Sequence, residues 1–127
     1  MPRDSMVRLK AFQVNEKTRQ RDQLAMTIDD FGRMADDLSA QIGAEEARSG
    51  ITDPTHFAYP MTAKAARTRR DKLDESAREL KVQLDAANIS LEEAQAELAK
   101  AEALDRRDGR TPMREPVAEQ RQSGMIG

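Results

Sequence analysis

The chain of 127 residues contains no cysteine, no tryptophan and one histidine, and aromatic residues make up only 3% of it. Without cysteine there can be no disulfide bond and no thiolate metal site. His56 cannot form a metal centre by itself, so no metal and no cofactor is expected. The scarcity of aromatic side chains also argues against a thick globular core.

Long apolar runs are missing as well. No stretch approaches the length of a membrane span, and residues 1–8 lack the apolar segment of a secretion signal. We therefore expect a cytoplasmic protein with no direct membrane insertion. The formal net charge of -2 provides no overall attraction to nucleic acid. The basic stretch from Arg67 to Arg70 has no interleaved aromatic residue for base stacking, so no nucleic acid partner is expected.

Catalytic groups are not recognisable in the sequence. Asp29 and Asp30 are adjacent, as are Glu92 and Glu93, and adjacent residues on a helix point apart instead of forming a carboxylate pair. No nucleophile is accompanied by a base. The sequence therefore predicts a protein that binds partners and is not an enzyme.

The second half of the chain has a heptad pattern. From Ala63 onward, apolar residues recur at alternating steps of four and three residues, which is the spacing of a left-handed coiled-coil seam. Arg70 is the one interruption. The seam positions are Ala66, Leu73, Ala77, Leu80, Leu84, Ala87, Leu91, Ala94, Leu98 and Ala101.

The first half carries a weaker series with the same spacing. Its apolar positions are Val7, Val14, Leu24, Ile28, Phe31, Ala35, Leu38 and Ile42. Lys10, Lys17 and Arg21 occupy the skipped points, so the seam is continuous from residue 24 to residue 42 and interrupted before that.

These patterns predict an all-α fold, with two long helices in an antiparallel coiled-coil hairpin and a disordered C-terminal tail. Helix one is expected at about 5–48 and helix two at about 61–107, so that the hairpin spans 1–107. Gly50, Pro54 and Pro60 mark the turn at 49–60. Residues 108–127 contain glycine and proline without apolar periodicity, which is typical of a disordered tail.

Charge blocks favour the antiparallel direction. Residues 3–21 are mainly basic and 22–46 mainly acidic, and helix two repeats this order in residues 64–81 and 85–105. Folding at the turn opposes unlike blocks and brings Ile42 near Ala66 and Leu24 near Leu84. An antiparallel homodimer of helix one would match charges too. The short connection favours the hairpin, because it raises the effective concentration of the second helix.

Two segments of non-repetitive sequence resemble a known family. They are Val7-Arg8-Leu9-Lys10-Ala11-Phe12-Gln13-Val14-Asn15-Glu16-Lys17-Thr18-Arg19-Gln20 and the turn from Gly50 to Pro60, which reads GITDPTHFAYP and precedes Lys64-Ala65-Ala66. Over roughly residues 5–107, the chain resembles FliJ-type flagellar export proteins of alphaproteobacteria.

The resemblance implies a component of the flagellar type III export apparatus, cytoplasmic and peripherally associated with that apparatus at the inner membrane. Members of this family look like the antiparallel coiled-coil stalk of the rotary ATPase gamma subunit. They bind the hexameric export ATPase through their paired helix termini, and they engage the export gate membrane protein and export chaperones. Enteric members use apolar residues at the start of helix two to bind the gate. Residues 62–67 contain no large apolar residue here, so that role is not carried over.

Candidate partner-binding residues lie at both ends of the predicted hairpin. Leu9 and Phe12 fall off the seam spacing beside Arg8, and the three could form a tip that enters an ATPase ring. Alternatively, they belong to a frayed helix end that covers the neighbouring seam. Phe57 and Tyr59, together with Met61, could form an exposed anchor at the turn or could close the end of the seam.

Two functions follow from these interpretations. The first is a soluble coiled-coil coupling component of flagellar export, with the export ATPase, the export gate and export chaperones as partners. The second is a coiled-coil adaptor or scaffold protein without an ATPase partner. Binding to the export ATPase discriminates between them.

Overall fold

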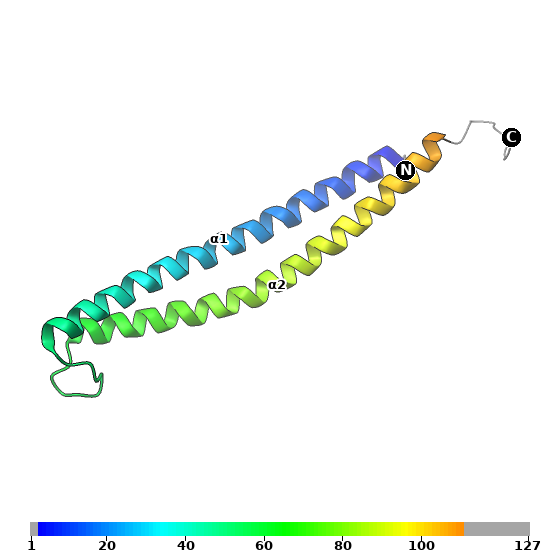
Figure 1. Cartoon of the computed structure of the whole chain (residues 1–127). Helices are drawn as coiled ribbons and strands as arrows, with labels where there is room; N and C mark the ends of the chain where they lie inside the picture. Colours follow the sequence, from blue (N-terminus) through cyan, green and yellow to red (C-terminus); the bar gives the residue numbers. More distant parts are fainter. Residues whose placement is uncertain (1–2, 111–127) are drawn as a thin grey trace. The chain divides into compact units, whose positions relative to one another are not determined.

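The computed structural model describes residues 3–110 and contains two long helices (Figure 1). Helix α1 spans Arg3–Ser49 and helix α2 spans Met61–Arg110, and no strand occurs between residues 3 and 110. The prediction of an all-α fold with two long helices packed against each other is confirmed. Helix α2 continues three residues beyond its expected end at 107, through Gly109. The remainder of the predicted tail, residues 111–127, lies outside the described residues.

The chain divides into two compact units. In the described part of the chain, unit 1 consists of residues 3–19 of α1 and 89–110 of α2, and unit 2 consists of residues 20–88, including the turn. Each unit pairs a segment of α1 with a segment of α2.

Unit 2 is an antiparallel helical hairpin whose core lies beside the turn. Ile42, with 4% of its surface exposed, packs with Leu38 and with Ala66, which is 1% exposed. Leu73 packs against this cluster. The predicted neighbours Ile42 and Ala66 are therefore in one layer. A large side chain on α1 faces a small one on α2, which lets the helices approach closely.

The heptad positions form the buried side of both helices. On α2, every predicted seam residue from Ala66 to Ala101 is buried or half-buried, and Arg70 at the interruption is half-buried too. On α1, every predicted seam residue from Val7 to Ile42 is also buried or half-buried. A period of 3.5 residues keeps one stripe of each helix facing the other along its length. The seam is thin, because a pair of helices shields each side chain from two directions only.

Unit 1 has a more polar seam than unit 2. Leu91 and Ala101 of α2 are buried, with 6% and 8% of their surfaces exposed. On α1, Lys10 and Lys17 are half-buried at seam positions. Lys10 forms an ion pair with Glu97 of α2 at 3.6 Å. Lysine places its aliphatic stem along apolar neighbours while its ammonium group stays near water, so these positions contribute less apolar contact than leucine would.

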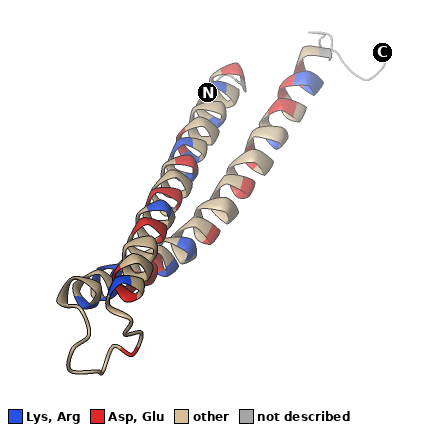
Figure 2. Ribbon diagram, turned by 60° about the vertical axis from the view of Figure 1, so that its left-hand side comes forward, with Lys and Arg blue, Asp and Glu red and all other residues tan. Residues whose placement is uncertain are grey.

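The pairing of opposite charge blocks is visible in both units. Figure 2 shows basic residues on the part of α2 next to the turn and acidic residues farther along this helix. Lys10 and Glu97 join the first basic block to the last acidic block. Glu46 and Arg67 join the two middle blocks at 3.3 Å. Other ion pairs link residues within one helix, for example Arg33 with Asp30, so the blocks set the direction of pairing more than they stabilise it.

Helix α1 ends at a glycine in a left-handed conformation. Gly50 has a φ of 75°, and its amide donates a hydrogen bond of 2.8 Å to the carbonyl of Glu46. This bond satisfies one of the free carbonyls at the helix end. Helix α2 begins after Pro60, whose carbonyl accepts a bond of 3.0 Å from the amide of Lys64. Gly50 and Pro60 therefore act as the helix-end and helix-start signals that the sequence predicts.

Candidate partner-binding surfaces

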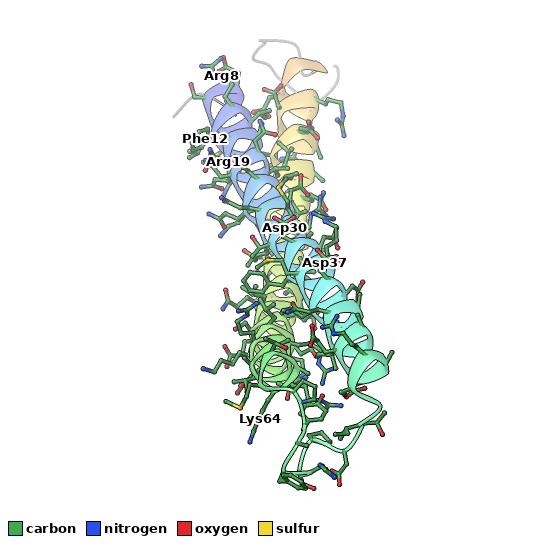
Figure 3. All side chains as sticks on the ribbon, turned by 90° about the vertical axis from the view of Figure 1, so that its left-hand side faces the viewer. Arg8, Phe12, Arg19, Asp30, Asp37 and Lys64 are labelled. Carbon is green, nitrogen blue, oxygen red and sulfur yellow. The ribbon has the colours of Figure 1, made fainter. Side chains whose placement is uncertain are left out.

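An exposed apolar patch lies on the α1 segment of unit 1. Leu9 is 42% exposed and Phe12 is 61% exposed, and Met6, three residues before Leu9, is 37% exposed. We call these three residues the terminal patch. Figure 3 shows Phe12 on the side of α1 that faces away from α2. Phe12 therefore does not cover the neighbouring seam, contrary to one of the two interpretations of the sequence.

The terminal patch is bordered by a partly engaged arginine. The guanidinium of Arg8 donates to Asp4 at 3.2 Å and to the hydroxyl of Ser5 at 3.2 Å. Its side chain nevertheless remains 72% exposed. An exposed ion pair of this kind exchanges its partner at little cost. Arg8 is therefore available to a carboxylate of a bound protein. Met6 was missed by the sequence analysis, although its three-residue spacing from Leu9 places both on one helix face.

A second exposed apolar group lies at the turn in unit 2. Phe57 is 97% exposed, and Met61, the first residue of α2, is 79% exposed. The imidazole of His56 stacks on the Phe57 ring, with 4.8 Å between the ring centroids. A fully exposed phenylalanine supported by a neighbouring ring presents a large apolar surface at little cost in conformational entropy.

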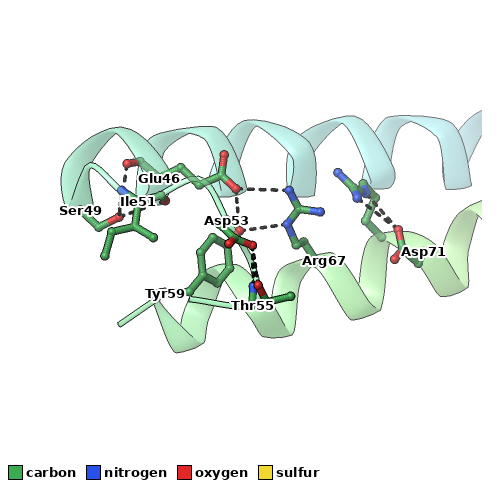
Figure 4. A network of polar contacts seen from close by, with 9 residues as sticks. Glu46, Ser49, Ile51, Asp53, Thr55, Tyr59, Arg67 and Asp71 are labelled. Carbon is green, nitrogen blue, oxygen red and sulfur yellow. Dashed lines mark hydrogen bonds and ion pairs between the residues drawn. The ribbon is translucent and has the colours of Figure 1, made fainter. Parts of the chain in front are cut away.

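Tyr59 does not belong to that exposed group. Only 6% of its surface is exposed, so Tyr59 is not the exposed residue that one interpretation of the sequence expected, and its burial agrees with the alternative, in which it closes the end of the seam. Its hydroxyl donates to the carboxylate of Glu46 at 2.7 Å and accepts from Nε of Arg67 at 2.9 Å (Figure 4). The Arg67 guanidinium also lies 5.9 Å from the centre of the Tyr59 ring.

Glu46, Tyr59 and Arg67 together form a polar clasp between the end of α1, the turn and the start of α2. Arg67 completes the triangle with a contact of 3.3 Å to the same oxygen of Glu46. The hydrogen bond from Tyr59 lowers the pKa of Glu46, and the Arg67 guanidinium lowers it further. Hydrogen bonds with Tyr59 and with Glu46 raise the pKa of Arg67. The clasp therefore favours the ionised carboxylate of Glu46 and the protonated guanidinium of Arg67, and it fixes the turn to the helix pair.

Short-range hydrogen bonds hold the rest of the turn. The carboxylate of Asp53 accepts from the amide and the hydroxyl of Thr55 at 2.9 and 2.8 Å, and these bonds lower the pKa of Asp53. The amide of Ala58 donates to Nδ1 of His56 at 3.0 Å. His56 thus has a structural role in shaping the loop. Phe57 projects from a turn whose conformation is set before any partner binds.

The basic stretch 67–70 is largely engaged within the hairpin. Arg67 belongs to the clasp, and Arg70 lies half-buried at the seam with an ion pair of 3.2 Å to Asp71. Arg69 is exposed beside a groove that the sequence analysis did not identify. This groove runs between α1 and α2 in unit 2, and it has Leu38 and Leu73 at its floor and Met34 on its wall.

Neither a metal site nor a membrane-spanning helix is present in residues 3–110. No three acidic or histidine side chains gather there in a way that could hold a metal ion. No helix in the same range is long and apolar enough to cross a membrane. Comparison of the chain with protein-family models, with curated proteins and with solved structures finds no match.

Proposed function

We propose that this protein is a FliJ-type coupling component of the flagellar type III export apparatus, which binds the ring of the export ATPase. The observation that carries the proposal is the terminal patch. It lies in the unit that contains the start of α1 and the end of α2, and its Leu9 and Phe12 belong to the segment that resembles the family. In that family, the paired helix termini associate with the ATPase.

The terminal patch supplies the two elements that a protein interface requires. Phe12 and Leu9 offer an apolar anchor that loses water on binding, and such anchors account for most of the affinity of an interface. Arg8 and the neighbouring bases steer an acidic surface toward the patch and select its orientation. The partner surface on the ATPase should therefore have an apolar pocket bordered by carboxylates.

A second partner would bind at the turn. The export gate membrane protein and the export chaperones are the candidates, and Phe57 with Met61 is the apolar surface on offer. Residues 62–67 provide Ala63 and Ala66, but both are buried in the seam. Any gate contact in this protein would therefore use the turn. In this role the protein would lie in the cytoplasm, and its partners would hold it at the inner membrane.

Binding to purified export ATPase tests the proposal directly. The variant Leu9→Ser/Phe12→Ser should weaken binding at least about tenfold, because it removes the anchor from an exposed surface. Met26→Ser is the matched control, since Met26 is 64% exposed on the same helix but lies in unit 2. Phe57→Ser should leave ATPase binding unchanged. Circular dichroism should show equal helix content in all of these proteins.

Two results would contradict the proposal. If the wild-type protein does not bind the export ATPase, the alternative is a coiled-coil adaptor or scaffold that joins two other partners through its two exposed apolar groups. If binding depends on Phe57 and not on Leu9 and Phe12, the protein binds the ATPase through the turn and the proposed orientation is wrong.

A further inference from the structure

One side of the unit 2 hairpin is depleted of charge. The residues that flank the seam there are Gln20, Thr27, Met34, Gln41 and Arg48 of α1 and Thr62, Arg69, Ser76 and Gln83 of α2, of which only Arg48, in the last turn of α1, and Arg69 are charged. The other side is different. Its flanking residues include Glu46, Arg67, Asp74 and Lys81. Loss of charge at the centre of a surface, with charges kept at the border, is characteristic of protein interfaces.

The groove on this charge-poor side exposes apolar surface. Met34 is 50% exposed, although Leu38 below it is 9% exposed. The charged residues at its border are Asp37 on α1 and Arg69 with Lys72 on α2, and all three are exposed. One border of the groove is thus acidic and the other is basic. A surface with this arrangement is complementary to a copy of itself.

We propose that a second copy of this chain binds at this groove, with a two-fold axis parallel to the helices, to form a four-helix bundle. Such an axis places α1 of one copy over α2 of the other at the same level of the hairpin. Asp37 of each copy then faces Arg69 and Lys72 of the other. Every helix runs antiparallel to both neighbours, as in an up-down-up-down bundle. The two Met34 side chains fill the grooves between them.

The alternative two-fold axis, perpendicular to the helices, is disfavoured by charge. It would place α1 over α1 and α2 over α2, so that acidic borders oppose each other and basic borders do the same. In the favoured arrangement, Asp30 of one copy lies at the level of Glu79 of the other copy. The ion pair of Asp30 with Arg33 on its own helix reduces the repulsion between these two carboxylates. The net effect of the charges therefore favours the axis parallel to the helices.

The expected interface is small. A contact of about 20 residues on each helix is about 30 Å long and, across two helices, about 20 Å wide. The contact would thus cover about 600 Å² on each copy, below the roughly 800 Å² of a typical stable complex. The dimer should therefore form reversibly with increasing protein concentration. It involves unit 2 only and does not depend on the proposed ATPase contact of the terminal patch.

Sedimentation equilibrium of the full chain, from about 1 to about 200 µM, tests the self-association. The wild-type protein should pass from monomer to dimer within this range. Met34→Glu should raise the dimer dissociation constant at least tenfold, whereas Met26→Glu, with the same change on an exposed part of the same helix, should leave it unchanged. A wild-type protein that remains monomeric throughout, or that loses dimerisation with Met26→Glu instead, overturns the proposal.

Charge reversal tests the direction of the axis. Asp37→Lys should abolish dimerisation, because the new lysine meets Arg69 and Lys72 of the second copy. The triple variant Asp37→Lys/Arg69→Glu/Lys72→Glu should restore it, since both borders are reversed together. Circular dichroism must show unchanged helix content. If Asp37→Lys dimerises as well as the wild type, α1 does not face α2 of the second copy, and the proposed arrangement is wrong.

Discussion

Replacing Ile42 by alanine should weaken the seam at its most buried layer. Ile42 is 4% exposed and packs with Leu38 and Ala66. The substitution removes three buried carbon atoms, which at about 0.8 kcal/mol each amounts to about 2.4 kcal/mol of lost transfer free energy. A cavity would add to this cost, but two helices open to water on both sides can move together and reduce it. We expect a loss of about 2 to 3 kcal/mol.

Urea unfolding followed by far-ultraviolet circular dichroism measures this loss. With a denaturant slope of about 1.5 kcal/mol/M, the midpoint should fall by about 1.3 to 2 M. Met26→Ala is the control, because Met26 lies on the same helix and is 64% exposed. The free energy of unfolding of this control should differ from that of the wild type by less than about 0.5 kcal/mol. Equal shifts for the two variants would show that the Ile42 layer is not the core of unit 2.

Three further predictions concern the helix, the clasp and the pairing in unit 1. Gly32→Ala should stabilise the hairpin by about 0.5 to 1 kcal/mol, measured in the same urea assay, because no atom lies within 4 Å of the added Cβ and glycine is a poor helix former. The folded pKa of Glu46 is lowered, so its carboxylate stabilises the hairpin above the ordinary glutamate range, and this contribution is lost as the pH falls through the lowered pKa. Tyr59→Phe removes the hydrogen bond that contributes most to the lowered pKa of Glu46. The carboxyl carbon resonance of Glu46 should therefore titrate at higher pH, and acid should destabilise the variant less than the wild type. An unchanged titration would contradict the role of the clasp. Spin labels at Arg8 and Glu102, both in unit 1, should lie within about two helix diameters, roughly 20 Å, and a much longer distance would refute the antiparallel pairing.

The seam could be predicted from the sequence because it depends on a single repeated spacing. The positions from Ala66 to Ala101 were identified by their steps of four and three, and the same spacing located the half-buried Lys10 and Lys17. Two paired helices can differ only in how far one is shifted along the other. A single contact, Ile42 opposite Ala66, therefore fixes the register of unit 2.

Tyr59 could not be assigned in this way. Its hydroxyl partners, Glu46 and Arg67, are 13 and 8 residues away along the chain. No local sequence pattern predicts that these three side chains meet. An aromatic residue in a turn can be either an exposed anchor or a buried part of the core. Phe57, two residues earlier, took the exposed position instead. The difference arises from the hydroxyl group, which allows Tyr59 to be buried with its polar atom satisfied.

The groove around Met34 was missed for a related reason. Met34 lies one position before the seam residue Ala35, where a helix pair provides cover from one side only. The heptad pattern describes which residues face the second helix, and it does not describe which flanking residues remain uncovered. Exposure of Met34 therefore had to be seen in the structure.

The polar clasp has a consequence for the order in which the chain folds. Glu46 and Arg67 are separated by 21 residues, whereas Lys10 and Glu97 enclose a loop roughly four times longer. Closing the longer loop first would cost about 1.2 kcal/mol more in chain entropy. Contacts at the turn should therefore form in the folding transition state, and helix pairing should then propagate away from it. Destabilising changes at the clasp would slow folding, whereas changes near Lys10 would mainly accelerate unfolding.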